Sequence, residues 1–410
     1  MTIKKVLVIG YVWPEPNSSA AGSHMLSLLT LFLAQGWHLT FASPAQLGEH
    51  KVDLSELGIS EQSIALNCPS FDSFISELNP DLVLFDRFML EEQFGWRVAR
   101  QCPDAIRILD TEDLHFLRNA RHTAHKQGRE LLDSDLKSEL AQREVAAIFR
   151  SDLSLIISDF ELNLLTESFS VPKDILQHCP FMLDLAHLKK ETPAYTQRQH
   201  FISIGNFRHA PNWDAVLWLK QEIWPLIRKQ LPQAELHIYG AYPPPKATQL
   251  HQPKDGFLVK GWAEDARQVM KQARVCIAPL RFGAGIKGKL AEAMLCGTPN
   301  VTTSIGIEGM HFGLPWPGKV ADSAEHIARA AVELYQGQDS WREHQKHGYD
   351  LLGQNFDRKR LAPLLLERIL RLKEELAAHR SNNFIGSMLR HHQHASTKYM
   401  AQWIEAKNRN

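Results

Sequence analysis

Short apolar runs alternate along this chain with longer segments in which apolar residues recur every three or four positions. The runs predict strands buried on both faces of a parallel sheet, and the three-to-four spacing predicts helices that cover it. In the first half, strands are expected at residues 6–10, 37–43, 81–86, 106–110 and 153–158. In the second half, they are expected at residues 201–207, 234–240, 256–265, 275–280 and 300–303.

This repeated order of strand, loop, helix and strand predicts an α/β fold. Two successive halves, each with ligand-type loops after its strands, predict two facing Rossmann-like domains with the active site in the cleft between them. The expected parts are an N-terminal domain over 1–186, a polar linker over 187–200, a C-terminal domain over 201–355, a C-terminal helix over 356–380 that can cross back to the first domain, and a tail over 381–410.

Helices are predicted from apolar spacing and from end signals, among them the following. The first begins near Ser23 and ends at a Gly36 C-cap. A long charged amphipathic helix is expected over 126–150. Another amphipathic helix is expected over 356–380, interrupted near Pro363 because proline lacks an amide donor.

The bulk composition narrows the function classes. Lys plus Arg and Asp plus Glu each number 46, so the chain is not a general polyanion binder, and no nucleic-acid partner is expected. Hydrophobic content of 44% and charged content of 22% are typical of a soluble globular protein. The five cysteines form no C-x-x-C pair and are interpreted as reduced thiols of a cytosolic protein.

No secretory leader and no apolar run of membrane-spanning length is recognised, so a cytoplasmic location is expected. The C-terminal basic helix allows peripheral contact with the inner face of a membrane, although its interleaved glutamates weaken that interpretation. The tail contains the sequence HHQH at 391–394. Adjacent histidines in a tail are usually solvated, and no metal is expected.

The segment 274–310 carries the most specific chemistry. A strand-like run is followed by a glycine loop, a helical pattern and a second strand-like run. The loop contains three glycines and two lysines, namely Gly283, Gly285, Gly288, Lys287 and Lys289. Backbone amides, a helix N-terminus and two ammonium groups together predict an anion site, for which a diphosphate is the natural ligand.

The same loop spells G-x-G-x-x-G, the spacing found in nicotinamide-dinucleotide sites. In such sites an acidic residue about 20 positions on ends the next strand. Glu308 lies at about that distance but in a glycine-bounded loop after the strand. The two lysines also favour a ligand with exposed phosphate charge, so a dinucleotide is the weaker interpretation, and a purely structural turn is the third.

The first half offers two further candidates. Gly22, with Ser23 beside it, stands where the first loop meets its helix and could bind an oxyanion, or the pair could only form an N-cap.

His115 follows the strand at 106–110 and is close in sequence to Asp110 and Asp113. It could donate to a substrate hydroxyl or support charge at a reacting centre. The alternative is an ordinary surface helix start, where acids are favoured by the helix dipole.

The segments FISIGNFRHAPNWDAV and PLRFGAGIKGKLAEAMLCGTPNVTTSIGIEGM resemble the donor domain of the GT-B glycosyltransferases, specifically the retaining group numbered family 4. The first half agrees more weakly, through the Gly22 loop, DTEDLHFLRNAR and SDFELNLLTESF. The resemblance implies a metal-independent, hexosyltransferase-like enzyme that retains anomeric configuration and has no cofactor. Its donor would be a UDP- or GDP-sugar, and its acceptor a glycan, glycolipid or polysaccharide precursor.

The resemblance also implies roles for individual residues. Glu292 is similar to the carboxylate that holds the donor ribose, and Lys287 or Lys289 to the cation that binds the diphosphate. The amides of Gly285 and Ile286 would cradle the same diphosphate. Arg208 is similar to a base that faces the phosphates, and Trp262 to a residue that lines the nucleobase. His115 is similar to the histidine beside the transferred sugar.

One position departs from the family pattern. Many members carry a second glutamate eight residues before the ribose-binding one, where it contacts the sugar, but position 284 here is alanine. The departure leaves the sugar and the residue-level mechanism open. Two alternatives therefore remain, a non-catalytic nucleotide-sugar-binding or scaffold protein of the same fold, and a nucleotide-sugar epimerase on that fold.

Overall fold

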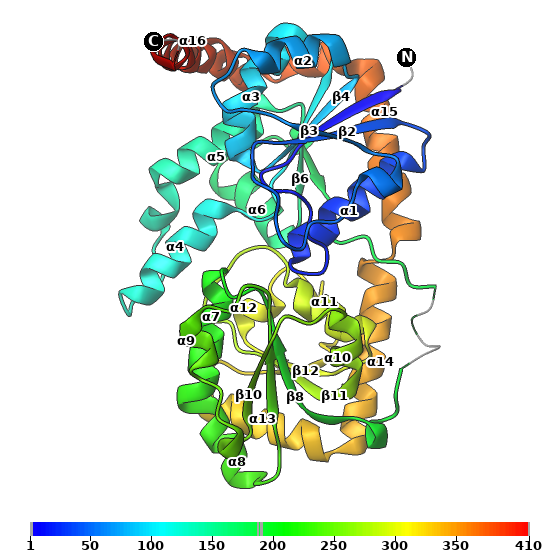
Figure 1. The fold of residues 1–410 in the computed structure, drawn as a ribbon, viewed down its shortest axis with the longest axis vertical. Coiled ribbons are helices and arrows are strands. Elements are labelled where there is room, and N and C mark those ends of the chain that lie inside the picture. The colour runs from blue at the N-terminus through cyan, green and yellow to red at the C-terminus, as the bar shows by residue number, and fades with distance from the viewer. Residues whose placement is uncertain (1–2, 187, 189–191, 409–410) are drawn as a thin grey trace.

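Two parallel sheets, each covered by helices, are stacked along the long axis of the protein (Figure 1). The computed structural model describes residues 3–186, 188 and 192–408, and for residues 392–396 the backbone. The predicted class of two Rossmann-like α/β domains is confirmed. The linker predicted at 187–200 lies partly outside the described residues, at 187 and 189–191.

In the described part of the chain, the first sheet has seven strands in the order β3-β2-β1-β4-β5-β6-β7, and the second has six in the order β10-β9-β8-β11-β12-β13. The strands of the first sheet are β1 Lys5–Ile9, β2 His38–Ser43, β3 Ser60–Ser63, β4 Leu82–Asp86, β5 Ile106–Asp110, β6 Leu153–Ile156 and β7 Leu176–His178. Those of the second are β8 Gln199–Ile204, β9 Leu236–Tyr239, β10 Phe257–Gly261, β11 Ala273–Ala278, β12 Asn300–Thr302 and β13 Gly318–Val320.

Helices connect and cover these strands. In the first half they are α1 Ala20–Leu33, α2 Ser70–Leu78, α3 Phe88–Gln101, α4 His115–Lys126, α5 Glu139–Arg150 and α6 Asp159–Ser168. In the second half they are α7 Ala210–Trp218, α8 Trp224–Gln230, α9 Pro245–Thr248, α10 Ala266–Gln272, α11 Gly288–Leu295, α12 Ser304–Ile307, α13 Ala324–Gln336 and α14 Gln338–Asn355. Two long helices follow, α15 Arg358–Asn382 and α16 Phe384–Asn408.

Burial explains which strands the apolar pattern could identify. Every residue of β4, β5 and β6 is buried, as a strand covered by helices on both faces requires. In contrast, β3 has the sequence SEQS and is exposed along its whole length. It pairs with β2 at the sheet edge through backbone groups, so its sequence carries no apolar signal.

The single helix predicted over 126–150 is wrong. Instead, α4 ends at Lys126, a 3₁₀ turn follows at Asp133–Lys137, and α5 begins at Glu139. Gly128 has a φ of 62°, which ends the first helix. The Ser138 side chain accepts from the Ala141 amide at 3.2 Å and caps the second.

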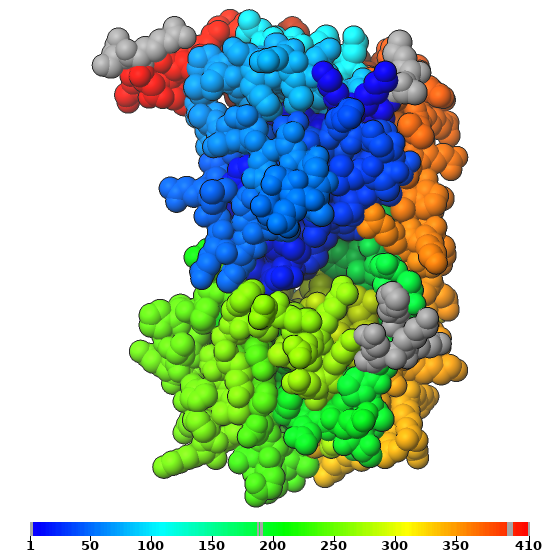
Figure 2. All heavy atoms as spheres, turned by 45° about the vertical axis from the view of Figure 1, so that its right-hand side comes forward, coloured from blue at the N-terminus to red at the C-terminus, as the bar shows by residue number. Residues whose placement is uncertain are grey.

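The predicted start of the first helix and the predicted break near Pro363 also need correction. Helix α1 begins at Ala20, three residues before Ser23, because Ser19 is its N-cap. Helix α15 runs unbroken through Pro363. Its apolar side chains, Leu365, Ile369 and Leu372 among them, are buried in the same cluster as residues of β1, β4 and β5, and this packing outweighs the proline. In Figure 2, α14 and α15 lie along one side of both domains.

The tail beyond residue 381, which the sequence left without a structure, contains α16. This helix packs against α3 and α5 of the first domain and extends past the edge of that domain (Figure 1). Gly386 makes the close approach possible, since a Cβ there would lie 2.1 Å from the Phe149 carbonyl oxygen.

A buried arginine joins the start of the second domain to its sheet. Arg198 is fully buried, and its guanidinium donates to the carbonyl oxygens of Pro193, Ala273 and Cys296 and to the Thr298 hydroxyl, at 2.7 to 3.2 Å. Burial lowers the pKa of Arg198 to about 10. The side chain satisfies several buried acceptors at once, at the cost of a desolvated charge.

Replacing Arg198 by methionine should therefore destabilise the second domain by about 3 kcal/mol or more, since several buried acceptors lose their donor. Chemical denaturation followed by circular dichroism measures the loss. Arg329→Met, on the exposed face of α13, is the matched control and should change stability by less than about 0.5 kcal/mol. Equal stabilities for the two variants would contradict the assignment.

Candidate active site between the two domains

The glycine loop lies at the carboxyl end of β11 and contacts the first domain directly. Helix α11 starts at Gly288, where a Cβ would lie 2.4 Å from the Cβ of Ala20. Ala20 is the first residue of α1. The N-termini of the two helices therefore meet across the interface, and their dipoles direct positive potential to the same region.

Lys289 is held beside this meeting point. Its Nζ donates to the Asn212 side-chain oxygen at 2.7 Å. A Cβ at Gly205 would lie 2.7 Å from the same Nζ, so the glycine that follows β8 makes room for the ammonium group. Burial is the main cause that lowers the pKa of Lys289 to about 8, and the nearby Lys287 lowers it further.

Lys287 is buried within the loop itself. Its Nζ donates to the carbonyl oxygens of Gly285 at 2.5 Å and Ala284 at 3.2 Å. Burial lowers the pKa of Lys287, while Glu308 and Glu161 act in the opposite direction. The hydrogen-bond partners of both lysines are neutral oxygens, so the loop keeps cationic character.

The Gly285 amide, expected to cradle a diphosphate, donates to Glu161 in this structure. The distance from the Gly285 nitrogen to Glu161 Oε1 is 2.8 Å, and the same oxygen accepts from the Leu114 amide at 2.9 Å. Burial raises the pKa of Glu161 to about 7, and Asp113 contributes. Gly285 has a φ of 63°, and its Cβ would lie 2.9 Å from that of Asp113. The side chain of Ile286 is buried in an apolar cluster shared by the two domains.

His115 starts α4 on the first-domain side of the loop. Its Nε2 lies 3.5 Å from Asp113 Oδ1, and Asp113 also receives two bonds from Arg118 Nη1 at 2.7 and 2.9 Å. Burial lowers the pKa of His115 to about 4, although Asp113 acts against it, so the ring is neutral at pH 7. Burial acts to raise the pKa of Asp113, but Arg118, His115 and His209 outweigh it and lower that pKa.

The structure places Arg208 and Trp262 at another part of the interface. The Arg208 guanidinium lies 3.7 Å from the ring centre of Tyr242, whose hydroxyl donates to both carboxylate oxygens of Glu15 at 2.9 and 3.0 Å. Trp262 stacks on His50 with ring centres 4.3 Å apart. These contacts form a rim made by both domains, which the sequence indicated only through its second-domain members.

Glu292 and Gly22 have local partners. Glu292 lies one turn into α11, with Oε1 3.8 Å from the Arg267 Nε, and burial raises the pKa of Glu292.

The Gly22 amide donates to the Ser19 hydroxyl at 3.0 Å, and a Cβ at Gly22 would lie 2.5 Å from the backbone of Glu15. The glycine thus has a packing reason of its own. The alternative that Gly22 and Ser23 form the N-cap is wrong, because both lie inside α1 and Ser19 is the N-cap.

Carboxylates at the ends of β4 and β5 are buried beneath the cleft. Asp110 Oδ2 lies 3.6 Å from His24 Nε2, and the Tyr11 amide donates to Asp86 Oδ2 at 2.9 Å. Burial alone would lower the pKa of His24, but Asp110 and neighbouring acids raise it to about 9. Burial raises the pKa of Glu112 to about 8, with Asp110 contributing. This acidic layer borders the first-domain side of the site.

Sequence reasoning missed the residues that join the domains. Arg121 donates to both carboxylate oxygens of Glu308 at 2.7 Å and to the Gly283 carbonyl oxygen at 2.8 Å. Arg121 and Glu308 are separated by 187 positions, so no local pattern could pair them. Glu161 stands three residues after Ser158, a spacing that indicates a capping box rather than a contact with another domain.

The described part of the chain contains neither a metal-binding cluster nor a membrane-spanning helix. No group of three or more His, Cys, Asp or Glu side chains there is arranged to hold a metal ion. His392 and His394 of the HHQH tract lie outside the side chains described. No helix among the described residues has the length and apolar content needed to cross a bilayer.

The Arg121–Glu308 pair should hold the glycine loop against the first domain. Arg121→Met leaves the Glu308 carboxylate without its bidentate partner, a loss of about 1–3 kcal/mol. The loop amides at 283–288 should then exchange with deuterium about 5- to 150-fold faster, as measured by mass spectrometry. Arg129→Met is the control, because Arg129 pairs with Asp135 inside the first domain. Unchanged exchange in Arg121→Met would rule out this role.

Comparisons with known proteins agree with this geometry. Residues 198–337 match the family model described as glycosyl transferases group 1. No curated protein matches the chain in sequence. Sucrose-phosphate synthase from Thermosynechococcus elongatus is similar in structure, with a TM-score of 0.66 at 16% identity over 92% of this chain and 100% of that chain.

Two further solved structures are similar over most of their length. HepE from Anabaena in complex with UDP-glucose has a TM-score of 0.66 at 12% identity, over 90% of this chain and 100% of that chain. WaaG, a glycosyltransferase involved in lipopolysaccharide biosynthesis, has a TM-score of 0.60 at 12% identity, over 88% and 98%. At such identities the likeness shows the fold alone, and that fold is the GT-B arrangement of two Rossmann-like domains.

Proposed function

We propose that this protein is a retaining, metal-independent glycosyltransferase of family 4. It transfers a sugar from a nucleotide diphosphate sugar, UDP- or GDP-linked, to a hydroxyl acceptor on a glycan, glycolipid or polysaccharide precursor. The observation that carries the proposal is the convergence of Lys287, Lys289 and two helix N-termini, those of α1 and α11, on one region between the domains. The group 1 match over the second domain supports the same class.

The loop cations suit a diphosphate leaving group. Lys289 is desolvated and its present partner is a neutral amide oxygen, so binding an anion would restore its full charge. Negative charge grows on the departing diphosphate as the glycosidic bond breaks. The two ammonium groups and the helix dipoles stabilise that charge.

The remaining roles follow the resemblance noted for the sequence. Glu292 holds the donor ribose, Trp262 lines the nucleobase and Arg208 faces the phosphates. Gly22, in the first turn of α1, borders the donor. His115 is neutral, so it positions the sugar by a hydrogen bond rather than by charge. The acceptor hydroxyl attacks the face that the diphosphate leaves and gives its proton to the leaving phosphate, which retains configuration.

Donor binding is linked to the contact between the domains. The Gly285 amide donates to Glu161, so a diphosphate that uses this amide displaces a carboxylate. We infer that the loop undocks from Glu161 when the donor enters, and that the Ile286 amide then becomes part of the phosphate cradle. Closure around the donor afterwards excludes water from the reacting bond.

We place the enzyme in the cytoplasm, with peripheral contact at the inner face of a membrane through its C-terminal basic segment.

The second candidate function is a non-catalytic nucleotide-sugar-binding protein. It is favoured by Ala284, which stands where many members have a glutamate and is packed in the core cluster of the first domain. A binding protein would hold nucleotide sugar without consuming it.

Release of nucleotide diphosphate from a panel of nucleotide sugars, with and without glycolipid acceptors, tests the proposed function. Lys289→Ala should lower turnover by about 100-fold or more while the fold is retained, because charge on the leaving group loses its main partner. Lys254→Ala, an exposed lysine of the same domain, should leave turnover within about twofold. Binding without release by the natural chain would favour the second candidate.

The lowered pKa of Lys289 makes donor binding depend on pH. With a pKa of about 8, the ammonium group loses most of its charge between pH 7 and pH 9. Affinity for UDP, measured by calorimetry, should fall by up to about tenfold over that range, since the protonated form binds the anion. Lys289→Arg keeps its charge and should give a flatter profile. Identical profiles for the two proteins would show that another group titrates.

A further inference from the structure

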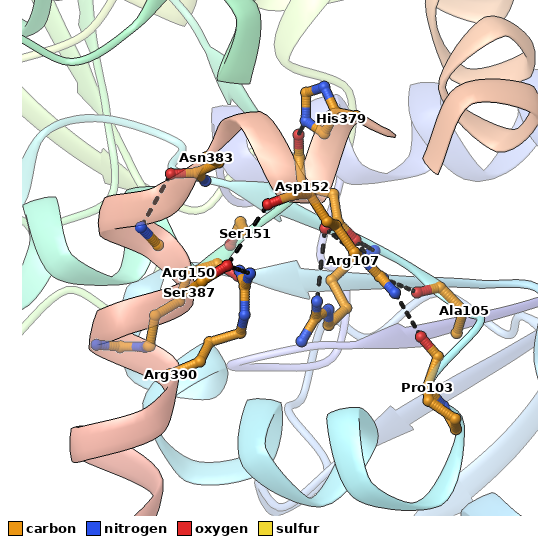
Figure 3. A network of polar contacts seen from close by, with 12 residues as sticks. Pro103, Ala105, Arg107, Arg150, Ser151, Asp152, His379, Asn383, Ser387 and Arg390 are labelled. Atoms are coloured by element: carbon orange, nitrogen blue, oxygen red, sulfur yellow. Dashed lines mark hydrogen bonds and ion pairs between the residues drawn. The ribbon is translucent and has the colours of Figure 1, made fainter. Parts of the chain in front are cut away.

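A second cationic site lies at the amino-terminal ends of the strands of the first sheet, whereas the cleft lies at their carboxyl ends. Arg107 is the second residue of β5, whereas Asp110 at the other end of this strand borders the active site. A cavity of about 520 Å³ opens beside Arg107, between the start of β5 and helices α15 and α16. Its lining includes Arg380, Ser387, Arg390 and His391. In Figure 3, Arg107 from the strand, Arg390 from α16 and Asp152 lie in one cluster.

One carboxylate serves two of these arginines. Asp152 is 1% exposed and accepts from Arg380 Nε at 2.8 Å and Nη2 at 2.7 Å. It also accepts from the Arg107 amide at 2.9 Å, and its Oδ1 lies 3.5 Å from Arg107 Nη2. Burial would raise the pKa of Asp152, but Arg107 and Arg380 outweigh it and hold that pKa at about 2.

The third arginine has neutral hydrogen-bond partners. Arg390 donates to the Arg150 carbonyl oxygen at 3.0 Å and to the Ser387 hydroxyl at 2.9 Å. Burial, together with Arg107 and Arg380, lowers the pKa of Arg390 to about 10. The nearby Glu91 is engaged with the Arg150 guanidinium. The cluster therefore carries more positive than negative charge in a partly desolvated place.

Arg107 provides independent evidence that the cluster has a hydrogen-bond donor without an acceptor. Its side chain is only 8% exposed, and its Nε is buried without a hydrogen-bond partner. A buried guanidinium donor of this kind is costly unless a ligand or a charge completes it. The cavity beside it offers the space for that ligand.

We propose that this cavity binds a phosphate group. Three guanidiniums and the Ser387 hydroxyl around one cavity match the tetrahedral oxygens of phosphate, which arginine binds through paired N–H donors. The positive excess favours an anion, and Asp152 orients two of the arginines toward it. The site is separate from the donor diphosphate site, which lies at the other end of the sheet.

The phosphate could belong to a soluble compound or to a lipid headgroup, since the recognition chemistry is the same. The exposed apolar side chains of Phe384, Ile385 and Met388 lie on α16 beside Ser387, with exposures of 74%, 46% and 45%. A headgroup in the cavity would bring these side chains to the bilayer. Both sources therefore belong in the test.

The first experiment compares the full chain with Arg390→Gln and Arg371→Gln. Arg371 is an exposed arginine of α15 and serves as the matched control. Calorimetry with inorganic phosphate reports the soluble source, and sedimentation with phosphatidylcholine vesicles, with and without phosphatidic acid, reports the lipid source. Affinity for at least one probe should fall about tenfold or more in Arg390→Gln and stay within about twofold in Arg371→Gln. Phosphate bound at the cleft lysines would not respond to Arg390→Gln.

The second variant is Ser387→Glu, which places a carboxylate in the cavity. It should raise the melting temperature in phosphate-free buffer and abolish the rise that phosphate gives the natural chain. If neither probe binds the natural chain, or if Arg390→Gln binds both probes as well as the natural chain does, the proposal is overturned. A lower melting temperature for Ser387→Glu, with phosphate stabilisation intact, would also overturn it.

Discussion

The close docking of the glycine loop onto the first domain is the contact on which the candidate active site depends. Gly285 and Gly288 have no room for a side chain, because Asp113 and Ala20 of the other domain stand where a Cβ would be. Two backbones can therefore approach until helix N-termini and ammonium groups share one region. A larger residue at either position would separate the domains and disperse the positive potential.

Charged side chains are buried at both ends of the strands of the first sheet, but the balance of positive and negative charge differs between the two ends. At the cleft, carboxylates and cations from both domains alternate, so that Glu161, Lys287 and Glu308 influence one another across the interface. Such pairs contribute little net stability but make the domain contact sensitive to any anion that enters. At the opposite end of the strands, Arg107 and Arg380 share the Asp152 carboxylate and Arg390 has neutral partners, which leaves an excess of positive charge.

The buried strands β4, β5 and β6 could be predicted from the sequence, because an apolar run is a local signal. The lysines at 287 and 289 are also a local signal, and the anion site that they indicate stays a prediction. The polar edge strand β3 carried no signal. The role of Glu161 was hidden because its spacing from Ser158 has a sufficient local explanation, while its contact with Gly285 joins residues 124 positions apart. Interdomain contacts of this kind depend on how two finished domains meet.

The path of α15 has a consequence for how the chain is made. Leu365, Ile369 and Leu372 complete an apolar cluster whose other members come from β1, β4 and β5. On a ribosome, β5 ends at Asp110 and α15 begins only at Arg358, so all three strands emerge long before the helix that covers them. The first domain must therefore wait, with one face of its sheet incompletely covered, until the second domain has been synthesised. Apolar surface that is exposed in this way makes a folding intermediate prone to aggregation.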